Sequence, residues 1–308
     1  MKRLCSFFLC LCLLLGAAGC AKAPKEQARV RLVASFYPIY IMALNLTDGI
    51  DDVSLDCMAS QETGCLHDFQ LQSEDMKSLE SADAILINGA GMESFLDKIF
   101  SELPALRVID SSAGITLIED EGHEHADEPH GRQEEHDHGE ANAHLWVSIS
   151  NCITQVHNLA DGLVSLDPQN ASRYRENERI YTEKLSALRD KMHAALADLS
   201  SRDIITFHEA FPYFAAEFDL HIVSVINREP SSEPNARELA DTIRLVRDSG
   251  VRALFAEPQY PETAADIVAA ESDAQVYTLD PCVSGEMDKD AYLRAMEQNL
   301  ETLLEALQ

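Results

Sequence analysis

The chain has 308 residues and a formal net charge of −29, with 24 Lys and Arg residues against 53 Asp and Glu residues. Such an acidic balance argues against binding to nucleic acid, whose phosphates need a basic surface, and it suits a protein whose ligand is a cation. The length predicts two domains, each large enough to bury a core of its own.

Residues 1–20 have the pattern of a targeting segment and are not expected to be part of the fold. Lys2 and Arg3 precede an apolar run that is shorter than the ~20 residues of a transmembrane helix, so a membrane-spanning anchor is the weaker interpretation. The ending Gly16-Ala-Ala-Gly-Cys20 resembles a bacterial lipobox, although Ala17 stands where that pattern usually has leucine. Cleavage before Cys20 and acylation of its thiol would anchor the protein to a membrane, with residues 21–28 as a tether.

The remaining cysteines suit an extracytoplasmic compartment, where thiols can form disulfides. They are Cys57, Cys65, Cys152 and Cys282. A Cys57–Cys65 disulfide would stiffen the segment before His67, and the alternative is a set of separate buried thiols. Because the chain has no Cys-x-x-Cys, neither a thiolate zinc site nor a redox motif is expected.

In the first half of the chain, short apolar runs alternate with segments of helical periodicity. Strands are expected at 30–35, 53–58, 84–88 and 107–110, and helices at 39–46, 73–80, 93–101 and 148–164. Asp167 and Pro168 are start signals for a long helix that reaches about Leu199. At ~1.5 Å per residue this helix would span roughly 48 Å, enough to cross a two-lobed protein.

The strand–helix alternation then restarts. Strands are expected at 203–207, 221–225, 251–256 and 275–279, and helices at 210–217, 235–249, 262–271 and 288–307. The pattern predicts an α/β protein with two lobes, each a mostly parallel sheet flanked by helices, joined by one long backbone helix. The expected bounds are 29–166 for the N-terminal lobe, 167–200 for the linking helix and 201–308 for the C-terminal lobe.

A histidine-rich acidic segment, 119–140, interrupts the first lobe. Its five histidines lie among ten Asp and Glu residues without apolar periodicity, so a mobile loop is expected. Imidazole and carboxylate together suit zinc-like ions, and we interpret the loop as an auxiliary metal-collecting segment. A merely solvated acidic loop is the alternative. The histidines are His123, His125, His130, His136 and His138.

Four potential metal ligands follow predicted strands or the loop. They are His67, His144, His208 and Asp280. In open α/β sheets ligands gather beyond the carboxyl ends of the strands, so two residues from each half can meet between the lobes. Three imidazoles and a carboxylate would form a tetrahedral zinc site. Taken singly, each histidine could be an ordinary surface group and Asp280 could simply start a turn.

Five other residues carry side chains that could bind or support a metal ion. Glu209 and Glu257 could orient a ligand histidine through its free ring nitrogen, or could be ordinary charges. Packing or solvent-facing roles are expected for His157, His193 and His221.

Several segments, taken together, resemble a known family. They are Ala34-Ser-Phe-Tyr-Pro38, Gly64–Gln70, Ser81–Gly89, Asn142-Ala-His-Leu-Trp146, Phe207–Phe211, Phe255–Gln259 and Leu279-Asp-Pro281. These segments resemble the metal-binding solute-binding lipoproteins of bacterial zinc and manganese ABC transporters, specifically the zinc-type (ZnuA-like) members. Cys65-Leu66 departs from many relatives at those positions. The resemblance implies two α/β lobes and a long connecting helix.

The resemblance also implies site residues. His67, His144 and His208 match metal-binding positions, with Asp280 or a water as the fourth ligand. Histidine at position 208 and a His-rich loop before His144 are zinc-type features, whereas manganese members carry a carboxylate in place of His208.

The expected function is therefore an extracytoplasmic, lipid-anchored, monomeric receptor that binds Zn²⁺ and hands it to an ABC transporter permease, and not an enzyme. Because the imidazoles must be unprotonated, affinity should fall below about pH 6. A manganese receptor is the alternative within the family. A zinc hydrolase, which lacks support from any His-Glu-x-x-His motif, and a surface adhesin with a structural metal are the alternatives outside it.

Overall fold

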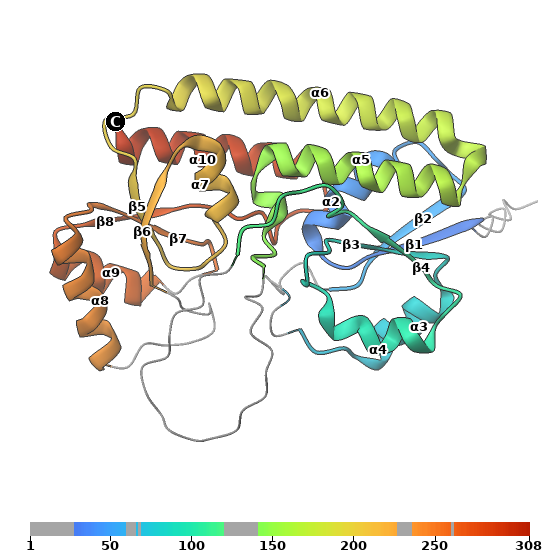
Figure 1. Cartoon of the computed structure of the whole chain (residues 1–308), viewed down its shortest axis with the longest axis horizontal. Helices are drawn as coiled ribbons and strands as arrows, with labels where there is room; N and C mark the ends of the chain where they lie inside the picture. The colour runs from blue at the N-terminus through green and yellow to red at the C-terminus, as the bar shows by residue number, and fades with distance from the viewer. Residues whose placement is uncertain (1–27, 60–65, 67–68, 120–140, 227–235, 260–261) are drawn as a thin grey trace, which may run out of the picture.

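Two four-stranded parallel sheets form the centres of two lobes in the computed structural model, which describes residues 28–59, 66, 69–119, 141–226, 236–259 and 262–308 (Figure 1). The first sheet has the order β2-β1-β3-β4, from β1 (Val30–Ala34), β2 (Val53–Cys57), β3 (Ala84–Ile87) and β4 (Arg107–Asp110). The second has the order β6-β5-β7-β8, from β5 (Asp203–Thr206), β6 (His221–Val225), β7 (Ala253–Ala256) and β8 (Gln275–Thr278). The predicted α/β fold class is confirmed.

Two of the inner strands, β3 and β7, are buried on both faces, which explains why the sequence has continuous apolar runs there. Helices cover both faces of each sheet, as parallel connections require. They are α2 (Tyr37–Leu46), α3 (Ser73–Ser81), α4 (Asp97–Glu102), α5 (Ile149–Leu166), α6 (Ala171–Leu196), α7 (Pro212–Phe218), α8 (Ala236–Ser249), α9 (Glu262–Ser272) and α10 (Ala291–Leu307), with short 3₁₀ turns η2 (Ser94–Leu96), η3 (Leu145–Val147) and η4 (Pro168–Asn170).

The buried apolar residues form one shared core and two smaller ones. Alternate residues of β1 face opposite sides, so Leu32 belongs to the shared core and Val33 to a small core under α3 and α4. A matching small core lies between the second sheet and α8 and α9. The shared core runs through both lobes along α2, α5, α6, α7 and α10, the side at the top of Figure 1. The lobes are therefore not separated by solvent on this side.

The long helix is shorter than predicted. It begins at Ala171 after the 3₁₀ turn and has 26 residues, or ~39 Å at ~1.5 Å per residue. Asp167 does not cap it, because its carboxylate accepts hydrogen bonds from Arg29, Asn170 and Tyr174 instead. The helix packs against both α5 and α10, so these three helices form one layer that extends over both lobes (Figure 1).

Helices α4 and α10 begin four and three residues later than the sequence predicts. The backbone at Glu93 stays outside α4 because its carboxylate turns inward to accept the N–H groups of Asn88 and Gly89. Helix α10 begins after Asp288, which accepts the N–H of Asp290 in a turn. Within the described residues, no helix has both the length and the apolar composition needed to cross a membrane.

Candidate metal centre

His208 lies directly beyond the carboxyl end of strand β5. The backbone N–H of Phe207 donates to Phe255 O at 3.0 Å, which continues the ladder between β5 and β7 for one more residue. Pro212 then opens helix α7, so the histidine occupies a short strand-to-helix turn. Its side chain is buried. The predicted strand-end position of His208 is confirmed.

His144 precedes the 3₁₀ turn η3, whose three apolar residues are all buried. The indole Nε1 of Trp146 donates to Pro281 O at 2.6 Å, and its ring meets Phe36 edge-on at 5.0 Å between centroids. On the other side, Asn88 Nδ2 donates to Ala143 O at 2.9 Å. Buried anchors on both sides of His144 therefore fix the position of its backbone.

The two histidines, one from each lobe, face each other. Their Nε2 atoms lie 3.3 Å apart, and the rings are nearly perpendicular, at 83°. Exposed fractions of 3% for His144 and 6% for His208 show that both are buried. Two nitrogens bound to one tetrahedral Zn²⁺ at ~2.0–2.1 Å would be about 3.3 Å apart. The separation of the two Nε2 atoms fits two of the four positions around such an ion.

Asp280 lies beyond β8 but is used in a local turn. Asn299 brackets its backbone by accepting the Asp280 N–H and donating to Asp280 O. One carboxylate oxygen accepts the N–H of Cys282 at 2.7 Å. Burial raises the pKa of Asp280 above its ordinary value, partly offset by that hydrogen bond.

Among the described residues, no three His, Cys, Asp or Glu side chains form a group that could hold a metal ion, so Asp280 does not join the two histidines there. His67 lies outside the described residues, but its neighbour Leu66 is buried in the shared core, and Phe69 N–H donates to Leu66 O. The set of four ligands stays a prediction. Of these four residues, the structure brings together His144 and His208.

The three remaining histidines in the described part of the chain make packing or surface contacts. His157 contacts Glu178 on α6, the ring of His193 packs 4.9 Å from that of Phe218, and His221 Nδ1 lies 2.9 Å from Asp203. Glu257 is buried just beyond β7. Glu209 uses its backbone carbonyl as an acceptor for Asn142. Supporting roles for the two glutamates stay predictions.

Three of the four cysteines considered above are described, and none of them has a disulfide partner among the described residues: Cys57, Cys152 and Cys282. Cys57 Sγ lies 3.2 Å from Ala59 O, and burial raises its pKa to about 12. Cys65 lies outside the described residues, so its disulfide with Cys57 stays a prediction. Cys20 and the five loop histidines lie outside them as well.

Asn142, which was not predicted as a site residue, also contacts His144 of the histidine pair. Asn142 Oδ1 lies 3.0 Å from the backbone N of His144, a turn in which an asparagine accepts the N–H two residues further on. The Asn-x-His spacing could have indicated this turn. Nothing local indicates its contact with Glu209, which is 67 residues away.

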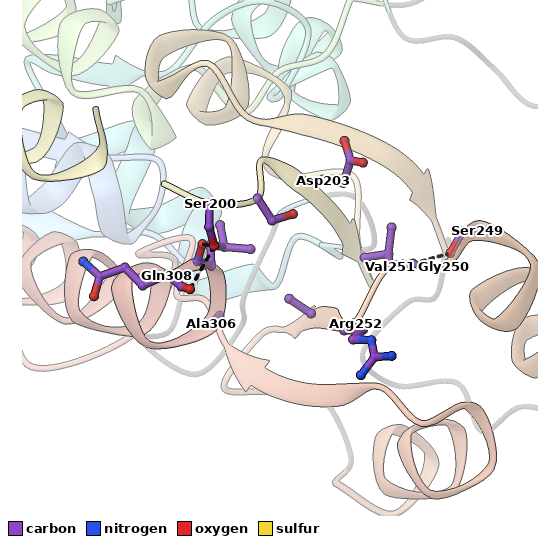
Figure 2. Close-up of a pocket in the computed structure, with 11 residues that line it drawn as sticks. Ser200, Asp203, Ser249, Gly250, Val251, Arg252, Ala306 and Gln308 are labelled. Carbon is purple, nitrogen blue, oxygen red and sulfur yellow. Dashed lines mark hydrogen bonds between the residues drawn. The ribbon is translucent and has the colours of Figure 1, made fainter. Parts of the chain in front are cut away.

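Two surface cavities lie at the amino ends of the strands, on the side of the sheets away from the histidine pair. Figure 2 shows one of about 290 Å³ near Ser200, Asp203 and Arg252, at the amino ends of β5 and β7. A second, of about 460 Å³, lies at the amino ends of β3 and β4 near Asp83 and Arg107. Since parallel sheets bind ligands at the carboxyl ends of their strands, neither cavity coincides with the histidine pair.

The chain is similar to several known proteins. It is 29% identical to the zinc-binding protein AdcA of Streptococcus pyogenes serotype M3 over 92% of this chain, but it spans only 57% of that relative's length. It is 27% identical to the high-affinity zinc uptake system protein ZnuA of Yersinia pestis, covering 89% of this chain and 90% of that one. The structure of the SBP FpvC of Pseudomonas aeruginosa in complex with Mn²⁺ superposes with a TM-score of 0.76 at 27% identity, covering 91% of this chain and 98% of that one. The family model "Zinc-uptake complex component A periplasmic" matches residues 32–306, and the chain therefore belongs to this ZnuA family.

Proposed function

We propose that the protein is an extracytoplasmic receptor that captures Zn²⁺ between its two lobes and delivers it to the permease of an ABC transporter. The observation that carries the proposal is the pair of buried Nε2 atoms of His144 and His208, 3.3 Å apart. The spacing suits two imidazole ligands of one zinc ion, and imidazole is a ligand that zinc prefers. The names of AdcA and ZnuA, which mention zinc, support the same cargo.

His67 would supply a third nitrogen, and Asp280 or a water the fourth position. Leu66 and Phe69, the described neighbours of His67, pack against the shared core, which would bring His67 to the carboxyl edge of the first sheet. For Asp280 to bind, a carboxylate oxygen would have to face the ion, and one of its two oxygens already accepts the N–H of Cys282. The role proposed for these groups is binding, without catalysis.

Loading should need little lobe motion. Besides the packing of α6 on α5 and α10, Tyr37 OH donates to Glu286 O at 2.8 Å and Asn45 Nδ2 to Lys289 O at 2.8 Å. These bonds connect α2 of the first lobe to the segment before α10. A wide hinge closure would break them, so local movement of the ligand-bearing turns is the expected response to the ion.

Residues 1–20 would be a cleaved lipoprotein signal, acylated Cys20 the membrane anchor, 21–28 the tether and 119–140 an accessory metal-collecting loop. The folded part would comprise lobes 29–166 and 201–308 around the linking segment 167–200, acting as a monomer.

The proposal is tested by competitive titration of Zn²⁺ and Mn²⁺ into the metal-free mature protein and its His208→Ala variant. One tight zinc site is expected, which Mn²⁺ does not displace and which His208→Ala weakens by about 100-fold or more. Such a loss follows if four ligands share the ~10–16 kcal/mol of a typical protein zinc site. Unchanged affinity in His208→Ala would contradict the site, and displacement of Zn²⁺ by Mn²⁺ would assign the cargo to manganese.

A further inference from the structure

Asn142 is buried, with 2% of its surface exposed, between the two turns that carry His144 and His208. Its side-chain Oδ1 lies 3.0 Å from the backbone N of His144, and its Nδ2 lies 2.8 Å from the carbonyl oxygen of Glu209. A backbone N–H can only donate and a carbonyl can only accept. The orientation of the Asn142 amide is therefore fixed by two partners of known polarity.

This orientation determines which ring nitrogen of His144 carries hydrogen. The ring Nδ1 lies 3.1 Å from the same Oδ1 of Asn142, an atom that can only accept. Nδ1 must then be the donor, and in the neutral imidazole the lone pair is left on Nε2. Nε2 is the atom that faces His208 at 3.3 Å.

The same amide also holds the opposite turn, because Glu209 directly follows His208. The backbone of Asn142 is itself fixed: its N–H donates to Ile118 O at 2.9 Å, and its carbonyl accepts the hydroxyl of Tyr213 at 2.8 Å. Tyr213 belongs to α7, the helix that follows the His208 turn, and its hydroxyl accepts the N–H of Ile118. Asn142 is thus connected to both lobes through backbone and side chain.

We propose that Asn142 is a positioning residue of the metal centre. It holds His144 in the tautomer with hydrogen on Nδ1 and, through Glu209, sets the distance between the two Nε2 atoms. The metal-binding part of this inference rests on the proposed function, whereas the tautomer part does not. Removal of groups that orient metal-bound histidines typically costs ~10–100-fold in metal affinity, which sets the expected effect.

The first measurement is the ¹⁵N NMR spectrum of histidine-labelled, metal-free protein, with His144 assigned by its substitution. At about pH 8.5, some two units above the ordinary histidine pKa of ~6.5, the neutral tautomers are distinguished by which nitrogen bears hydrogen. Wild type should show hydrogen on Nδ1 of His144. Hydrogen on Nε2 in the wild type would overturn the proposal, whatever any variant does.

Two substitutions then separate the bonds of Asn142. Asn142→Ala removes all three side-chain hydrogen bonds and should give a mixed tautomer and about 10–100-fold weaker zinc binding. Asn142→Asp keeps an acceptor for His144 but loses the donor to Glu209, so it should restore the Nδ1–H tautomer. Retention of the tautomer in Asn142→Ala, with zinc affinity within about twofold of wild type, would overturn the proposal.

Asn45→Ala is the matched control. Asn45 is also a buried asparagine, and its Nδ2 donates to the carbonyls of Ile41 and Lys289 without touching a histidine. It should lower stability but leave the tautomer and the zinc affinity unchanged. A loss of affinity equal to that of Asn142→Ala would assign the effect to general destabilisation and contradict the proposal. If wild type binds no zinc but keeps the tautomer, the proposed function fails while the role of Asn142 in orienting His144 stands.

Discussion

The turn that carries His208 and the turn that carries His144 are held in different ways. His208 follows a strand whose ladder continues up to Phe207, so the main chain delivers it to the edge of the sheet. The turn of His144 depends instead on the side chains of Asn142, Trp146 and Asn88. Two buried histidines that face each other can therefore be positioned by backbone hydrogen bonds in one turn and by buried side chains in the other.

If the main chain positions His208, its side chain can be changed without disturbing the backbone of the turn. His208→Asp should weaken zinc binding by about 100-fold or more and raise the affinity for Mn²⁺ relative to Zn²⁺, because carboxylate suits manganese better than imidazole does. Competitive titration measures both. His221→Ala is the control. It removes an exposed histidine whose ring Nδ1 contacts Asp203, and it should change neither affinity. An unchanged metal preference in His208→Asp would show that position 208 does not select the ion.

The His144 turn should be sensitive to loss of its side-chain anchors. Trp146→Phe removes the donor to Pro281 O and leaves a void in a fully buried position. An unpaired buried carbonyl and a small cavity together should lower the free energy of unfolding by about 3 kcal/mol. Because the chain has a single tryptophan, urea unfolding must be followed by circular dichroism. Tyr292→Phe, which loses only the hydroxyl bonded to Trp146 O, should cost less. A loss below about 1 kcal/mol for Trp146→Phe would contradict the anchoring role.

The buried carboxyl of Glu93 is bonded to Asn88, one of the anchors of the His144 turn, and it should make the free energy of unfolding depend on pH. Glu93 accepts the Ser35 hydroxyl and the backbone N–H groups of Asn88 and Gly89, and burial raises its pKa to about 7 from 4.5. The folded protein then binds this proton more tightly than the unfolded chain. The contribution of Glu93 is therefore fully present below about pH 4.5 and is lost as the pH rises through 7.

The prediction is that unfolding free energy falls by about 2 kcal/mol between pH 5 and pH 8 because of Glu93, at ~1.36 kcal/mol per pKa unit. Glu93→Gln should remove this decrease, as measured by urea unfolding across that range. Glu102→Gln, at an exposed position of α4, is the control and should keep the wild-type pH dependence. The same pH dependence in Glu93→Gln and wild type would show that Glu93 is not its source.

The contrast between the two turns also explains what the sequence could predict. Buried strands such as Ala84–Ile87 are visible as apolar runs, and His208 follows from its place after such a run. The long helix begins later than the sequence predicts because Asp167 has the local signature of a cap, whereas its carboxylate accepts a hydrogen bond from Arg29, 138 residues away. The role of Asn142 depends likewise on a contact with Glu209 that only the fold creates.

The smallest effect is expected from removing the segment between the two paired ends of the His-rich insertion. Glu119 and Ala141 form an antiparallel bridge, and Asn142 N–H donates to Ile118 O at 2.9 Å, so the ends of the insertion already lie side by side.

Replacing 120–140 with a short Asn-Gly turn should leave the affinity of the tight zinc site within about threefold and raise stability by about 1 kcal/mol, since a shorter loop costs less closure entropy. A full-length control, with serine at His123, His125, His130, His136 and His138, separates the chemistry of the loop from its length. Isothermal titration should show fewer weak sites in both variants. If the tight site were lost in both, the loop histidines would be its ligands; if it were lost only in the shortened chain, the His144 turn would need the length of the insertion as a support beyond its three side-chain anchors.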